Sequence, residues 1–149
     1  MKKTVTWVLI ADGARATVLA NDGPGRGLRP APPGEIETEL HPNREIVSDR
    51  PGRVYESATS ARHAVTPRID WHRVEKVEFA QRLAQILDQA AREGLFHRLV
   101  LVAPPRTLGD LRAALDEKTL KLVTAEIGKD LTNTPPAELP AHLGEALRL

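Results

Sequence analysis

Residues 99–103 read Leu-Val-Leu-Val-Ala, and this unbroken apolar run ends at Pro104-Pro105. A strand that is apolar on both sides is typical of the centre of a sheet, where helices cover both faces and neighbouring strands run parallel. Parallel neighbours need crossover connections, which usually contain a helix. The run therefore predicts an α/β fold with residues 99–103 as a central strand.

A long amphipathic helix is predicted immediately before this strand, from Trp71 to Glu93. Apolar residues recur there at spacings of three and four, the period that places them on one helix face. Asp70 is the expected N-cap and Gly94 the expected residue just beyond the C-terminus. The apolar positions are Val74, Val77, Phe79, Ala80, Leu83, Ile86, Leu87, Ala90 and Ala91.

The first forty residues predict an antiparallel meander of three strands, at Thr4–Ile10, Arg15–Ala20 and Glu35–Leu40. The first two are apolar or β-branched, and the third alternates acidic residues with Ile36, Thr38 and Leu40. Turn signals at 11–13 and 21–27 separate them. Gly23-Pro24-Gly25-Arg26-Gly27 could also cradle a phosphate, but no helix start follows it, so a hairpin turn is favoured.

After the central strand we expect a helix at Leu108–Leu115, a turn or helix at Glu117–Leu122, a last strand at Val123–Ile127 and a terminal helix at Glu138–Leu147. A meander followed by βαβα crossovers gives a mixed sheet with helices on both faces. The expected fold is thus an α/β mixed sheet, and its meander resembles the one that opens the ribonuclease H-like fold. We expect residues 1–149 to form a single domain, since that length suits one.

Residues 41–69 show no periodicity, and a structureless stretch of this length is normally functional or mobile. They include the most cationic part of the chain, with Tyr55 and His63 nearby, so phosphate contacts and base stacking are both conceivable. Alternatively, the arginines pair with Asp49, Glu56 and Asp70 and merely order the loop. The candidate phosphate-binding residues are Arg50, Arg53, Arg62, His63 and Arg68.

No complete catalytic motif is present. Asp12, just after the first strand, could bind a metal, since two-metal nucleases need several converging carboxylates. Glu35, Glu37 and Glu39 could supply a second ligand, but their alternation is typical of a solvated strand face. A turn or cap role for Asp12 is therefore favoured. Ser57 and Ser60 could be nucleophiles only beside a base, and no Gly-x-Ser-x-Gly elbow exists.

Composition bounds the remaining possibilities. The chain has no cysteine, which excludes disulfides and thiolate metal sites, and its formal net charge is +1, which gives no strong overall field. No run approaches the roughly 20 apolar residues of a membrane span, and no signal segment is recognised. We therefore expect a cytoplasmic protein that requires no cofactor and lean towards a protein that is not an enzyme.

Several segments together resemble the bacterial host-attachment protein family: residues 7–16, 21–25, 48–54 (Ser-Asp-Arg-Pro-Gly-Arg-Val), 60–64 and 99–105. The resemblance covers nearly the whole chain. That family is in turn similar to the middle domain of archaeal and eukaryotic peptide-chain release factors, which has a ribonuclease H-like fold. There a mobile loop carrying Gly-Gly-Gln precedes a long helix, and residues 57–63 fall at that position.

This chain lacks Gly-Gly-Gln, because Gln81, Gln85 and Gln89 all lie in the predicted helix. Peptidyl-tRNA hydrolysis is therefore not expected. What the resemblance still implies is a non-catalytic domain that binds RNA, with the ribosome or tRNA as partner. The alternatives are a protein-interaction or small-ligand module in attachment to host cells, and a metal-dependent nuclease using Asp12.

Overall fold

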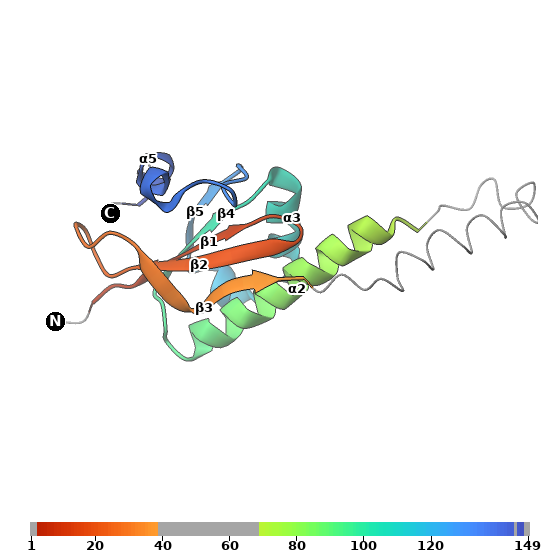
Figure 1. Ribbon diagram of the computed structural model, residues 1–149. Coiled ribbons are helices and arrows are strands. Elements are labelled where there is room, and N and C mark those ends of the chain that lie inside the picture. The colour runs from red at the N-terminus through yellow and green to blue at the C-terminus, as the bar shows by residue number, and fades with distance from the viewer. Residues whose placement is uncertain (1–2, 39–68, 145, 148–149) are drawn as a thin grey trace, which may run out of the picture.

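The computed structural model describes residues 3–38, 69–144 and 146–147. Its centre is a five-stranded mixed sheet with the order β3-β2-β1-β4-β5 (Figure 1). β1 pairs antiparallel with β2 and parallel with β4, while β3 joins β2 antiparallel and β5 joins β4 parallel. The strands are β1 (Thr6–Ala11), β2 (Arg15–Asn21), β3 (Arg29–Glu37), β4 (Arg98–Val102) and β5 (Val123–Ile127).

The central strands are buried on both faces. All six residues of β1 are buried, and so are Leu99, Val100, Leu101 and Val102 of β4. This confirms the antiparallel meander and the central parallel strand expected from the apolar runs. It also gives the reason for those runs, because neither face of these strands meets water.

One face of the sheet is covered by three helices, α2 (Trp71–Arg92), α3 (Pro105–Ala114) and α4 (Glu117–Leu120). Phe79, Leu83 and Leu87 of α2 pack with the β1 side chains Trp7 and Leu9 in the larger core cluster. The predicted helix ends are confirmed, since the Asp70 side chain accepts a hydrogen bond from the Arg73 amide and Gly94 has a φ of +71°. The Arg73 guanidinium pairs with Asp110, which ties α2 to α3.

The opposite face is covered by the chain that follows β5. It includes the 3-10 helix η1 (Pro136–Glu138) and the short helix α5 (Leu139–Leu143), which lies across the sheet from α2 (Figure 1). Leu131, Leu139 and Leu143 pack there against Val8, Ile10, Val100 and Val102. Helices therefore lie on both faces of a mixed α/β sheet, as the sequence predicted.

Several boundaries differ from those expected, and three of the differences have a clear physical context. β3 begins at Arg29 rather than Glu35, because an edge strand tolerates Pro30, Pro32 and Pro33 and a register shift lies beside them. α3 begins at Pro105 rather than Leu108, since proline suits the first helical position. The expected helix 138–147 is shorter, with α5 ending at Leu143.

The single-domain extent 1–149 stays a prediction. So does the functional or mobile character of the 41–69 loop, of which all but Ile69 lies outside the described residues. Within the part of the chain that the structure describes, no helix is both long enough and apolar enough to cross a membrane.

We expect Leu87→Ala to lower the free energy of unfolding by about 2–5 kcal/mol, because the substitution leaves a cavity in a close-packed core. Leu87 is 0% exposed, whereas Leu95 is 41% exposed and serves as a matched control. Urea denaturation followed by circular dichroism measures both. Equal losses for Leu87→Ala and Leu95→Ala would contradict the assignment of the core.

Candidate functional site

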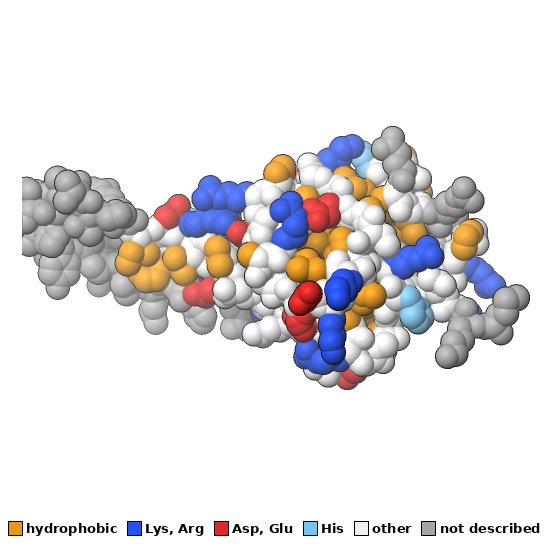
Figure 2. Space-filling view, turned by 180° about the vertical axis from the view of Figure 1, so that it is seen from behind, with side chains coloured by type: hydrophobic (Ala, Val, Ile, Leu, Met, Phe, Trp, Pro, Cys, Tyr) orange, Lys and Arg blue, Asp and Glu red, His pale blue; other side chains and the backbone are white. Residues whose placement is uncertain are grey.

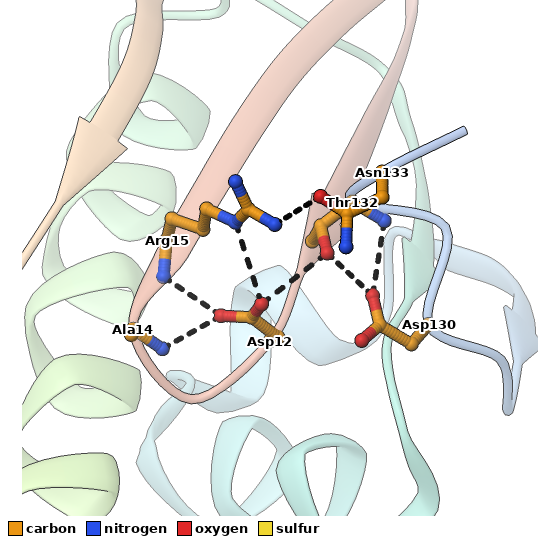
Figure 3. Close-up of polar contacts among 6 residues, drawn as sticks. All are labelled: Asp12, Ala14, Arg15, Asp130, Thr132 and Asn133. Atoms are coloured by element: carbon orange, nitrogen blue, oxygen red, sulfur yellow. Dashed lines mark hydrogen bonds and ion pairs between the residues drawn. The ribbon is translucent and has the colours of Figure 1, made fainter. Parts of the chain in front are cut away.

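The turn between β1 and β2 is built around the Asp12 carboxylate (Figure 3). Its Oδ1 atom accepts hydrogen bonds from the backbone amides of Ala14 at 2.8 Å and Arg15 at 2.9 Å. The Asp12 amide donates in return to the Arg15 carbonyl at 2.9 Å. Asp12 therefore closes the hairpin through its own side chain, the local role that aspartate often takes in turns.

A segment distant in sequence meets this turn. Thr132, which follows β5, places its hydroxyl 3.2 Å from Asp12 Oδ2 and 2.5 Å from Asp130 Oδ1 (Figure 3). Arg15 Nε lies 3.6 Å from Asp12 Oδ2, and Arg15 Nη2 donates to the side-chain oxygen of Asn133. Five side chains from two ends of the chain thus form one polar cluster, which we call the Asp12 cluster: Asp12, Arg15, Asp130, Thr132 and Asn133.

The position of the Asp12 cluster follows from the direction of the strands. β1 and β5 run in the same direction as β4, so the segments that follow β1 and β5 leave from the same edge of the sheet. In open α/β sheets this carboxyl edge is where ligands usually bind. The topology therefore places the Asp12 cluster at the sheet edge where a ligand-binding or catalytic site is expected.

Packing against α2 fixes the turn from the other side. A Cβ atom built on Gly13 would lie 2.6 Å from Cγ and 2.8 Å from Cδ of Lys76, so the lysine stem packs directly over the glycine. The Thr38 amide donates to the Ala14 carbonyl at 2.8 Å, which adds the end of β3 to the same turn. A side chain at position 13 would force the exposed Lys76 side chain to move from this place.

The electrostatics favour the ionised carboxylate. Partial burial acts to raise the pKa of Asp12, but hydrogen bonds from Ala14, Arg15 and Thr132, together with the Arg15 charge, outweigh it. The net effect lowers the pKa of Asp12 below its ordinary value of 3.8. Asp12 is therefore a permanent anion near neutral pH, which is unsuited to a general acid or base.

The hydrogen bonds of Asp12 are those of the turn role favoured from the sequence. Among the described residues, no group of three or more histidine, aspartate or glutamate side chains is placed to hold a metal ion. Glu35 and Glu37 line a small pocket of about 80 Å³ with Arg15, Thr17 and Thr132, while Glu39 lies outside the described residues. The metal alternative for Asp12 thus gains no set of ligands from this part of the chain.

The other predicted site residues lie outside the described residues: Arg50, Arg53, Ser57, Ser60, Arg62, His63 and Arg68. Asp70, which was considered as a partner for the loop arginines, uses its carboxylate to cap α2. Sequence reasoning missed Asp130, Thr132 and Asn133. The available signal was an Asp-x-Thr-Asn stretch soon after the last strand, at the sheet edge that also carries Asp12.

The sequence matches the model of one protein family over most of its length. The family model described as "Protein required for attachment to host cells" matches residues 7–143, nearly the whole chain. The chain belongs to this family. The resemblance to the host-attachment family inferred from the sequence motifs is thereby confirmed, and the matched region runs from β1 to the end of α5. A search among curated proteins gave no match. The family's description names a role in attachment and no reaction.

We expect Asp12→Ala to lower the free energy of unfolding by about 0.5–2 kcal/mol, the usual cost of losing a capping side chain. Asp12→Asn keeps an oxygen for the two backbone amides and should cost less. Because the pKa of Asp12 is lowered by folding, the stabilisation that the charge provides is present above the ordinary value of 3.8 and is lost as the pH falls through the folded pKa.

Urea denaturation of the wild type and Asp12→Asn at several pH values measures this effect. The advantage of the wild type should be constant above about pH 5 and should disappear in strong acid. An advantage that grew as the pH fell would show that folding raises the pKa instead.

Proposed function

We propose that the chain is a non-catalytic binding domain that serves attachment to host cells by contacts of its surface. The observation that carries this proposal is the set of contacts made by the Asp12 carboxylate, the candidate metal ligand that follows β1. Oδ1 accepts two backbone amides, and Oδ2 faces the Thr132 hydroxyl and the Arg15 guanidinium. These contacts give the carboxylate a structural role, because they hold the β1–β2 turn and join it to the segment after β5.

A catalytic role would require a different pKa of Asp12 or further carboxylates beside it. A general base near neutral pH needs a pKa close to the working pH, whereas the pKa of Asp12 is lowered. A two-metal site needs further carboxylates within coordination distance, and the described residues bring no such group together. The family description supports a role in attachment, and a domain that binds without reacting fits both facts.

Attachment of bacteria that carry Asp12→Asn in place of the wild-type chain tests this proposal. We expect attachment within about twofold of the wild-type level, because the amide oxygen still accepts from the two turn amides, while the acceptor that faces Thr132 and Arg15 is replaced by an NH2 donor. Asp12→Ala, measured in parallel, shows how much destabilisation the assay tolerates. Loss of attachment by a stable Asp12→Asn protein would show that the carboxylate charge itself is used, and the proposal would fail.

A second candidate, binding to RNA or the ribosome, is favoured by the cationic stretch between β3 and α2. Residues 50–68 contain Arg50, Arg53, Arg62 and Arg68 against the single acid Glu56. The strand order β3-β2-β1-β4-β5, with the first three strands antiparallel, supports a ribonuclease H-like arrangement similar to a release-factor middle domain. This role would place the protein in the cytoplasm with the ribosome or tRNA as partner.

The described surface adds little to such binding. Figure 2 shows lysine and arginine side chains interspersed with acidic ones over one face of the molecule. Arg29, Arg92 and Arg112 are each paired with a carboxylate of the chain itself, at 2.7, 3.2 and 2.8 Å. Phosphate contacts would therefore depend on the 50–68 stretch, whose arginines and His63 stay the proposed contacts.

Replacing Arg53, Arg62 and Arg68 together by alanine tests the RNA-binding candidate. The slope of log K against log salt for a single-stranded RNA should fall by about 2, since each phosphate contact contributes roughly 0.7. The matched control replaces Arg26, Arg98 and Arg106, three exposed arginines that make the same change in net charge. Equal effects of the two triple variants would show that only net charge matters.

Sedimentation of the wild-type protein with ribosomes at low salt is the second readout. A protein that never sediments with ribosomes and binds no RNA in a salt-dependent manner would remove this candidate and leave the attachment proposal intact.

A further inference from the structure

A groove lies between the edge strand β3 and the helix α2, and none of the residues of the Asp12 cluster lines it. Its volume is about 690 Å³, which falls within the range of sites that bind ligands or peptide segments. β3 forms one wall with Pro32, Pro33 and Ile36. The opposite wall comes from the second half of α2, and residues 93–95 close one end.

The floor and one end of the groove are apolar. Trp7 of β1 contributes to the floor and is packed against Phe96, with ring centroids 4.9 Å apart. Ile86 of α2 lines the wall and is only partly buried. Leu95 is 41% exposed and is one of two large hydrophobic side chains left exposed among the described residues, the other being Ile69. An apolar side chain from a partner would cover Leu95 and Ile86 together.

The edge strand is unsuited to the addition of another strand. Pro30, Pro32 and Pro33 have no backbone N–H to donate, and the register of β3 against β2 shifts in the same stretch. Gly34 follows with a φ of +62°. Prolines and bulges are devices that prevent edge-to-edge pairing. A partner in this groove would therefore be held by its side chains, as a helix in a groove is.

The charges around the groove indicate the charge that a partner should carry. Glu35, Glu37 and Glu93 line it with one cation, Arg82, whose Nη1 atom donates to the Glu37 carbonyl at 3.1 Å. Glu35 and Glu37 also line the small pocket beside Arg15, so these two acids stand along the outer edge of the sheet. The balance at the groove is acidic, whereas the chain as a whole has a formal net charge of +1. Such a rim attracts cations and disfavours acidic partners.

We propose that this groove binds an amphipathic helix of a partner protein whose apolar face is flanked by lysine or arginine. The apolar face would cover Leu95, Ile86 and the Trp7 floor, while the basic flanks would meet Glu93 and the β3 glutamates. This inference rests on the proposed binding function and names the class of partner that the groove accepts.

Fluorescence anisotropy with a labelled synthetic peptide tests the inference on the full chain. The probe is a helical peptide of about 18 residues, about 27 Å long, with leucines at i, i+3, i+4 and i+7 and lysines on both flanks. A second peptide of the same leucine pattern carries glutamates in place of the lysines. We expect saturable binding of the lysine peptide that weakens with salt, and at least tenfold weaker binding of the glutamate peptide.

Two variants and two matched controls localise the binding. Leu95→Ser should weaken the lysine peptide about threefold to tenfold through lost apolar contact, and Glu93→Lys should weaken it and flatten its salt dependence. Ile69→Ser and Glu138→Lys change equivalent exposed residues that do not line the groove, and both should bind as the wild type does. All four sites are exposed, so the fold should be retained.

Equal binding of the two peptides, or equal effects of the variants and their controls, would overturn the inference. So would a concentration-dependent dimer that Leu95→Ser abolishes, because the groove would then be occupied by a second copy. The attachment assay separates this result from the general proposal. Attachment that survives Asp12→Asn while the peptide fails to bind would reject the groove and leave the binding function standing.

Discussion

Burial of β1 and β4 on both faces of the sheet is the constraint on which the rest of the structure depends. Ten residues of two adjacent strands are buried, so each face needs a cover that supplies matching apolar side chains. The long helix α2 and the shorter α3 cover one face. The described part of the chain after β5 covers the other face with three buried leucines, Leu131, Leu139 and Leu143. The two layers are unequal in extent, which leaves the outer part of β2 and β3 partly open.

The Asp12 cluster shows how the thinner layer is held in place. Leu131 is buried under the sheet, and its neighbours Thr132 and Asn133 make polar contacts with the β1–β2 turn, while Asp130 accepts hydrogen bonds from Thr132. Asp12 lies at the sheet edge where ligands usually bind in α/β folds. Here its carboxylate joins two segments of the chain that are 120 residues apart. Its lowered pKa has the same origin as its structural role, because the amides and the hydroxyl that hold the turn also favour the anion.

In the proposed binding function, attachment depends on surfaces of the protein, and the described surface offers two of different character. The face shown in Figure 2 mixes charges of both signs, and Arg92 and Arg112 of the described residues are paired with carboxylates of the chain itself. The β3–α2 groove is instead apolar at its floor and acidic at its rim. Ion pairs on an open surface contribute little to binding or stability, whereas an apolar groove contributes through the area it removes from water. The groove is therefore the part of the described surface best suited to specific recognition.

The sequence by itself determined the elements that local patterns encode. The apolar run at 99–103, the helical period from Trp71 and the cap residues Asp70 and Gly94 each state a backbone preference that the neighbouring residues reinforce. Ends that depend on context were less well predicted: proline-bearing β3 extends further than expected because it lies at an edge, and α3 begins at a proline.

The candidate site also has a part that the sequence predicts and a part that depends on the tertiary structure. Asp12 could be recognised from its turn, since both amides that it accepts lie within three residues of it. Thr132 and Asn133 could not, because no local pattern encodes a contact across 118 residues or more. The β3–α2 groove likewise exists only after folding, when Leu95, Ile86 and Trp7 from three segments come to line one surface. Local periodicity and capping follow from backbone sterics and hydrogen bonding between near neighbours, whereas these long-range contacts depend on how the strands are ordered in the sheet.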